Sequence, residues 1–166
     1  MKIYKLLIDS REQKPYNFKG ETTDVRALKT GDYSIEIMGE DCSSQIVCER
    51  KELSDFISCV CQQRDRFIRE LERSMEIPHF FIIIEGDWKT IETGQYYSKV
   101  NPNSIIESIL GWQIKYGCQF ILAGNRTRGE RLTKKILLHY LKYKTEKPKK
   151  KEKVSNSLVE ESVSLL

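Results

Sequence analysis

The segment VCERKELSD, residues 47–55, places an acid, a guanidinium and an ammonium side by side directly after an apolar run. Residues 45–49 are rich in β-compatible side chains, so we predict a strand that ends near this charged group. Side chains alternate along a strand, so Glu49 and Lys51 should project from one face and Arg50 from the other. An ordinary strand end needs only a turn, and the segment therefore predicts a functional site.

Carboxylates also mark the ends of other predicted strands. Upstream we predict, in order, a strand at 3–8, a loop at 13–31, a strand at 33–37 and a hairpin-like turn at 39–41. Asp9 and Asp32 lie at boundaries of these strands, as Glu49 lies at the next. Backbone pairing fixes the position of side chains at such boundaries, so the three acids are candidates for one site.

Helices and buried strands alternate downstream. We predict a helix at 56–75, capped by Ser54 or Asp55 and broken near Gln62–Gln63, a strand at 80–84, a helix at 103–116, a strand at 119–123 and a helix at 128–143. This order predicts an α/β fold, a three-layer α/β/α sandwich with a central mixed sheet. We expect one domain over 1–146 and a basic, flexible tail over 147–166, which is more simply solvated than bound to phosphate.

The composition excludes several classes of protein. The chain has 166 residues, 39% hydrophobic and 31% charged, with a formal net charge of +4, which suits one domain with a mild basic bias. Five cysteines without a CxxC pair and two distant histidines disfavour a zinc site and predict reduced thiols. No signal peptide and no membrane-spanning apolar run is present, so we expect a soluble intracellular protein.

The charged residues suit a hard divalent ion. Mg²⁺ favours oxygen ligands and keeps several waters, so one to three carboxylates are enough to hold it. The Lys51 ammonium can orient a water, assist its deprotonation if the lysine pKa is lowered, or pair with a phosphate oxygen as a compact charge. Together these groups match the needs of phosphodiester hydrolysis. The Glu-x-Lys pattern alone is weak, because surface strands often pair these residue types.

Several motifs occur together in a recognisable order. Gly31-Asp32 followed by Glu49-Arg50-Lys51 is the pattern of the PD-(D/E)XK nucleases. The segments IDSRE (8–12), LKTGDY (28–33), VCERK (47–51) with Asp55, Arg66-Phe67 and IIIEG (82–86) follow the order of the XPF-type nuclease domain. From about residue 3 to residue 143 the chain resembles that family, which includes the archaeal Hef nucleases. The resemblance implies a restriction-endonuclease-like core and a DNA endonuclease requiring Mg²⁺ or Mn²⁺, acting on branched, flap or junction DNA in repair, recombination or replication.

The resemblance also implies roles for individual residues. Asp9, Asp32 and Glu49 are similar to the metal-site acids of the family, and Lys51 to its catalytic lysine. Supporting signature residues are Arg11, Arg50 and Asp55, and DNA-binding candidates are Arg64, Arg66, Arg69 and Arg73. Simpler readings stay open: Asp9 as a turn residue, Arg11-Glu12 as a surface pair, Asp55 as a helix cap, Arg50 as a bracing ion-pair partner, Glu85 as an acid behind the site, and the arginines as a solvated helix face.

The partners are less well defined by the sequence. Cellular members of the XPF group usually continue into a tandem helix-hairpin-helix module, whose Gly-rich hairpins are absent from the printed sequence. Selectivity would then come from a homodimer or heterodimer through the helices at 103–116 and 128–143, from a separate partner, or would be largely lacking. The alternative function is a catalytically silent DNA-binding subunit of an active nuclease, and a weaker one is a restriction-type or RNA-acting nuclease. We expect a cytoplasmic or nucleoid-associated location in a prokaryote or phage, and a nuclear one through the basic tail in a eukaryote.

Overall fold

The computed structural model describes residues 2–146. The basic tail expected at 147–166 lies outside these residues. Within them, no helix is both long and apolar enough to cross a membrane.

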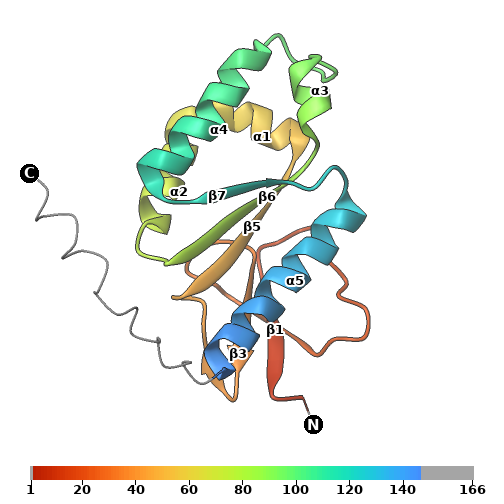
Figure 1. The fold of residues 1–166 in the computed structure, drawn as a ribbon, viewed down its shortest axis with the longest axis vertical. Helices are drawn as coiled ribbons and strands as arrows, with labels where there is room; N and C mark the ends of the chain where they lie inside the picture. The colour runs from red at the N-terminus through yellow and green to blue at the C-terminus, as the bar shows by residue number, and fades with distance from the viewer. Residues whose placement is uncertain (1, 147–166) are drawn as a thin grey trace, which may run out of the picture.

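A mixed sheet forms the centre of the described part of the chain (Figure 1). Its strands are β1 (Tyr4–Asp9), β2 (Thr23–Arg26), β3 (Tyr33–Ile37), β4 (Glu40–Asp41), β5 (Ile46–Glu52), β6 (His79–Glu85) and β7 (Gln119–Leu122). Their order is β2-β1-β3-β5-β6-β7, and the short β4 pairs with β3. β3 is antiparallel to both β1 and β5, whereas β5, β6 and β7 are mutually parallel. The pairing therefore changes direction at β5.

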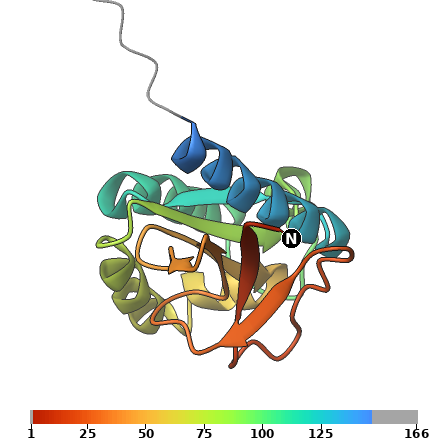
Figure 2. The ribbon, with the colours of Figure 1, turned by 90° about the horizontal axis from the view of Figure 1, so that it is seen from below.

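Helices cover both faces of this sheet. One face carries α1 (Leu53–Val60), α2 (Arg64–Ser74) and α4 (Pro102–Tyr116), and the other carries α5 (Arg126–Thr145). A short helix, α3 (Trp88–Glu92), follows β6. Figure 2 shows α5 along one side of the sheet and α1 with α2 on the opposite side. The predicted three-layer α/β arrangement is confirmed.

Each face has its own aromatic core. Between the sheet and the first helix layer, the ring edges of Phe56 and Phe67 meet Trp112, which is a core residue. On the α5 side, Tyr16 stacks on Tyr33 at a centroid distance of 4.9 Å. Tyr16 comes from the irregular segment at 10–22, so this loop completes the layer that α5 begins.

Most predicted elements form where the sequence placed them, and the helix predicted at 56–75 does break, at residues 61–63. Three details were wrong. β5 continues past Lys51, because it pairs with β6 along its whole length, up to Glu52 opposite Glu85. The predicted loop at 13–31 contains β2, which pairs with β1. Neither Ser54 nor Asp55 caps α1: the helix begins at Leu53, after Glu52, whose side chain makes no capping hydrogen bond.

Candidate active site

Asp32 is fixed between two strands by backbone hydrogen bonds. Its N–H donates to the carbonyl of Cys48 at 3.0 Å, and its carbonyl accepts from the N–H of Asp9 at 2.8 Å. Its carboxylate Oδ2 accepts from the N–H of Arg50 at 2.7 Å, which places the acid beside Glu49. The preceding Gly31 has φ +75°, and a Cβ there would lie 2.0 Å from Cγ1 of Val47. Only glycine allows the chain to approach β5 this closely.

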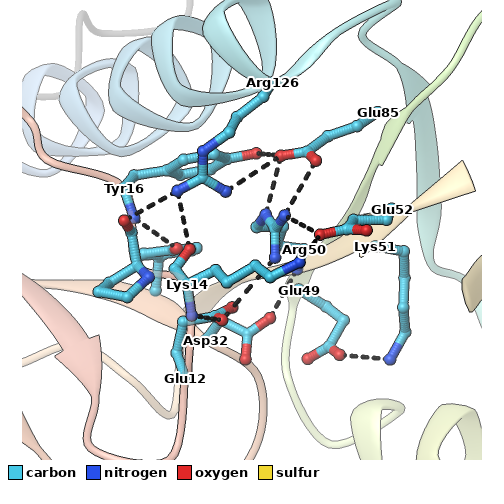
Figure 3. A network of polar contacts seen from close by, with 12 residues as sticks. Glu12, Lys14, Tyr16, Asp32, Glu49, Arg50, Lys51, Glu52, Glu85 and Arg126 are labelled. Atoms are coloured by element: carbon cyan, nitrogen blue, oxygen red, sulfur yellow. Dashed lines mark hydrogen bonds and ion pairs between the residues drawn. The ribbon is translucent and has the colours of Figure 1, made fainter.

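Glu49 and Lys51 lie on one face of β5, as the alternation of side chains predicted. Lys51 Nζ lies 2.6 Å from Glu49 Oε1 and 3.8 Å from Glu70 Oε2 of α2. These three residues and Asp32 line a hollow of about 420 Å³, which we call the central hollow. Figure 3 shows Glu49 and Lys51 on one side of β5 and Arg50 reaching to the other. The predicted meeting of Asp32, Glu49 and Lys51 therefore occurs.

The pKa values of both carboxylates are raised above their ordinary values. Burial raises the pKa of Asp32 to about 7, although its hydrogen bond from Arg50 acts in the opposite direction. Burial and the nearby charge of Asp32 raise the pKa of Glu49 well above its ordinary value. Two acids in one hollow resist being ionised together, and a divalent cation held by both would remove that penalty.

Lys51 remains a cation in this setting. Burial lowers the pKa of its ammonium, but the charges of Glu49 and Glu70 outweigh burial and the net pKa lies above the ordinary value. A lysine held in this way supplies fixed positive charge rather than a base at neutral pH. The geometry thus favours the water-orienting and phosphate-pairing roles over proton abstraction.

The donor set fits Mg²⁺ or Mn²⁺ with two protein carboxylates. Among residues 2–146, no group of three or more His, Cys, Asp or Glu side chains is arranged to hold a metal ion. Mg²⁺ keeps several of its waters in proteins and is commonly held by one or two carboxylates. Asp32 and Glu49 supply hard oxygen donors of this kind and have a charge that needs neutralising.

Asp9 is buried beside this pair, but its oxygens are already engaged. Oδ1 accepts from the N–H of Leu28 at 2.8 Å, and Oδ2 accepts from Nε of Arg11 at 2.9 Å. Burial raises the pKa of Asp9, but these hydrogen bonds lower it further, to below its ordinary value. Asp9 therefore anchors the segment that leads to Asp32. Asp9, Asp32 and Glu49 line one hollow, and a ligand role for Asp9 stays a prediction.

A second, smaller hollow of about 280 Å³ adjoins the first, and we call it the side hollow. It shares Asp32, Glu49 and Lys51 with the central hollow and adds Asp9 to the wall. Its cationic lining consists of Arg11, Lys29, Lys51, Arg66 and Arg73. The alternative of an Arg11-Glu12 surface pair is not realised, because Arg11 binds Asp9 instead.

Arg50 braces the site from the opposite face of β5. Its Nε and Nη2 donate to the two carboxylate oxygens of Glu85 on β6, at 2.8 and 3.0 Å (Figure 3). Nη2 also donates to Glu52 at 3.0 Å, and the hydroxyl of Tyr16 donates to Glu85 at 3.0 Å. The bracing role considered for Arg50 therefore occurs, and Glu85 is its main partner. The network joins β5, β6 and the loop at 10–22.

The arginines of α2 do not form a single face. Arg66 lines both hollows and Arg73 lines the side hollow. Arg64 points the other way, with its guanidinium 4.9 Å from the ring centroid of Trp112 and a hydrogen bond to Ser108 Oγ. Residues 64 and 66 lie about 200° apart around a helix, which explains this separation. Arg64 is therefore set apart from Arg66 and Arg73, and its role in DNA binding stays a prediction.

Two further predicted residues occupy the edge of the site. Arg69 is exposed and lines neither hollow. Asp55 is in the first turn of α1 and lines the central hollow, where its charge also favours the helix N-terminus. A direct role for either residue stays a prediction.

Sequence reasoning missed two acids of the site. Glu70 lines both hollows, and Glu12 lies 3.8 Å from Arg50 with its side chain only 9% exposed. For Glu70 a signal was present, since it follows Arg66 by four residues on a helix and so shares its side. Glu12 follows a strand end in an irregular segment, where spacing gives no direction.

This α/β sheet places the acids Asp32 and Glu49 beside the lysine of a Glu-x-Lys motif, an arrangement that suits phosphodiester hydrolysis. The family model of the ERCC4 domain matches residues 8–138, and the chain belongs to this family of DNA nuclease domains. The predicted resemblance to the XPF-type nuclease domain is thereby confirmed.

Solved structures show the same fold. XPF from Aeropyrum pernix is 20% identical, with a TM-score of 0.65, over 82% of this chain and 65% of that chain. XPF from Aeropyrum pernix in complex with DNA is 20% identical, with a TM-score of 0.65, over 87% of this chain and 68% of that one. The chain thus spans about two thirds of the length of these proteins. No curated protein matches the sequence.

Proposed function

We propose that this chain is a divalent-metal-dependent DNA endonuclease that hydrolyses phosphodiester bonds. One observation carries the proposal: the Asp32 and Glu49 carboxylates lie together in a hollow, with the Lys51 ammonium 2.6 Å from Glu49. Family membership supports the same chemistry.

Asp32 and Glu49 would hold Mg²⁺ or Mn²⁺. When bound, such an ion activates a water and neutralises charge that develops on the phosphoryl oxygens. Lys51 presents a fixed ammonium that pairs with a phosphate oxygen or orients the attacking water. Asp9 and Gly31 keep Asp32 in place through the backbone and the Leu28 contact. These residues arrange the reacting groups before substrate binds, which removes reorganisation from the chemical step.

Positive residues beside the acids suit a nucleic-acid backbone. Arg11, Lys29, Arg66 and Arg73 line the side hollow next to the acid pair. Each can neutralise a phosphate, so binding should weaken as salt rises. The similar XPF structure in complex with DNA supports DNA as the partner. We propose branched, flap or junction DNA as the substrate class, by analogy with the XPF group.

Dimerisation belongs to the same proposal. Leu110 and Ile114 are exposed apolar side chains on α4, at 46% and 87%. Exposed large apolar residues on one helix support the prediction of a homodimer or heterodimer through α4 and α5. Sedimentation of the purified chain at several concentrations would test this part separately.

Cleavage assays test the activity. Labelled duplex, flap and four-way substrates should be cut in Mg²⁺ or Mn²⁺ and not in chelator. Asp32→Asn and Lys51→Ala should each lower the rate by about 100-fold or more, whereas the exposed Lys135→Ala on α5 serves as a matched control and should cut normally. Unchanged cutting by the two site variants would refute the site. Binding of forked DNA without cutting in any metal would instead favour the silent-subunit alternative.

A further inference from the structure

Glu70 is an acid of α2 whose side chain faces the site, and the predicted motifs do not include it. It lies between Arg66 and Arg73, at spacings of four and three, and lines both hollows with Arg66 and the side hollow with Arg73. Its side chain is only 21% exposed. The other acids of this helix, Asp65 and Glu72, are exposed and line neither hollow. Glu70 is therefore the one acid that α2 directs at the acid pair.

Lys51 lies between two carboxylates from different elements. Glu49 Oε1 is 2.6 Å from Nζ and belongs to the same strand, whereas Glu70 Oε2 is 3.8 Å away and belongs to α2. The Lys51 side chain is 17% exposed, and Nζ also lies 5.5 Å from the ring centroid of Phe67. An ammonium has three donors, so Glu49 leaves it free to pair with a second acceptor.

The two carboxylates have different second functions. Glu49 also lies beside Asp32, so these two acids can share a metal ion, whereas the ion pair of Glu70 is with Lys51. When Glu49 binds a cation, its negative charge is shared and its hold on Lys51 weakens. A buried ammonium without a carboxylate partner is costly, so another partner must keep it in the hollow.

We propose that Glu70 is a positioning residue that holds the Lys51 ammonium in the central hollow and frees Glu49 for the metal ion. This inference rests on the proposed nuclease function and adds a residue to it. Glu70 acts through Lys51 and not through the reacting phosphate. The position of α2 thereby helps to determine where the ammonium of Lys51 lies.

Metal binding gives a test that does not depend on catalysis. Titration calorimetry with Mn²⁺ would compare the wild type, Glu70→Gln, Lys51→Met, the double variant and the control Glu72→Gln. Without Glu70, Lys51 must be removed from Glu49 before the ion can bind, so Glu70→Gln should weaken Mn²⁺ binding by about tenfold. Glu72→Gln should bind as the wild type does. In the Lys51→Met background, Glu70→Gln should change binding by less than about twofold.

Kinetics give the second readout. Glu70→Gln should lower kcat at saturating Mn²⁺ while leaving KM for DNA near the wild-type value, and should have no added effect in Lys51→Met. Equal weakening of Mn²⁺ binding in both backgrounds would mean that Glu70 acts as a charge or a ligand independently of Lys51, and would overturn the proposal. A Glu70→Gln variant indistinguishable from Glu72→Gln would also overturn it, while leaving the nuclease function intact. A wild type that neither binds Mn²⁺ nor cuts DNA would overturn both.

Discussion

Replacing Arg50 with methionine should destabilise the folded chain by about 3 kcal/mol. The Arg50 and Glu85 side chains are 7% and 8% exposed and form two hydrogen bonds, so methionine leaves Glu85 as a buried, partly unpaired charge. Breaking such a pair costs about 3–5 kcal/mol. We expect the lower end, because Glu85 keeps the Tyr16 hydroxyl at 3.0 Å and Arg126 Nη1 at 3.8 Å.

Urea unfolding in chelator is the suitable assay, since it excludes metal and DNA. Arg50→Met should lower the unfolding free energy by about 3 kcal/mol, which corresponds to roughly 6–12 °C in Tm for a chain of this size. Glu85→Gln should also destabilise, and the double variant should lose less than the sum by about 2 kcal/mol. As a matched control, Lys142→Met removes an ion pair of α5 whose lysine is 69% exposed, and should change stability by no more than about 0.5 kcal/mol.

Two results would refute this reasoning. A loss below about 1 kcal/mol for Arg50→Met would mean that water or another residue replaces the bidentate pair. A double variant whose loss equals the sum of the single losses would mean that Arg50 and Glu85 stabilise the chain independently. Either outcome would remove the brace as the reason for the fixed position of β5.

Three shorter predictions concern close approaches and charge. Gly31→Ala should cost about 2–5 kcal/mol in urea unfolding, because φ is +75° and the new methyl would meet Val47 at 2.0 Å; a near-neutral result would contradict the geometry. Gly129→Ala should cost about 1–3 kcal/mol, since its Cβ would lie 2.4 Å from the Tyr16 hydroxyl, and an unshifted Tm would exclude this contact. Burial raises the pKa of Asp32 to about 7, so in chelator the folded state alone holds this proton between about pH 4 and pH 7. Stability should therefore fall with rising pH across that window, by up to about 1.4 kcal/mol per unit from this group, and Asp32→Asn should reduce the slope to what Glu49 contributes; an equally steep slope in the variant would assign the effect elsewhere.

Local periodicity was enough to predict the centre of the site. The two-residue period of a strand places Glu49 and Lys51 on one face and Arg50 on the other, whatever the rest of the fold does. The position of Asp32 could also be predicted, because the chain reverses between β3 and β5 and so brings the start of β3 beside β5. These inferences need only the element type and the nearest strand pairing.

Other features depend on packing between distant elements. The direction of Arg64 is set by where α2 contacts α4, and a charge pattern along one helix does not contain that information. The position of Asp9 at a strand end is visible in the sequence, but its acceptance of the Leu28 N–H is not. The sequence places Glu70 on the same side of the helix as Arg66, but the packing of α2 against the sheet decides whether that side faces the site. Tertiary contacts fix all three.

The hydrogen bonds of Arg126 limit how far the chain can be shortened without losing the site. Its Nη2 donates to the carbonyls of Lys14 and Pro15 at 2.9 Å. These hydrogen bonds hold the loop at 10–22, beside the central hollow, against the start of α5. A truncation chosen from the catalytic motifs alone could stop after β6 and would keep every acid and the lysine. It would nevertheless free the loop at 10–22 and expose the core around Tyr16 and Tyr33 to solvent. Minimal domains and fusion junctions should therefore retain α5.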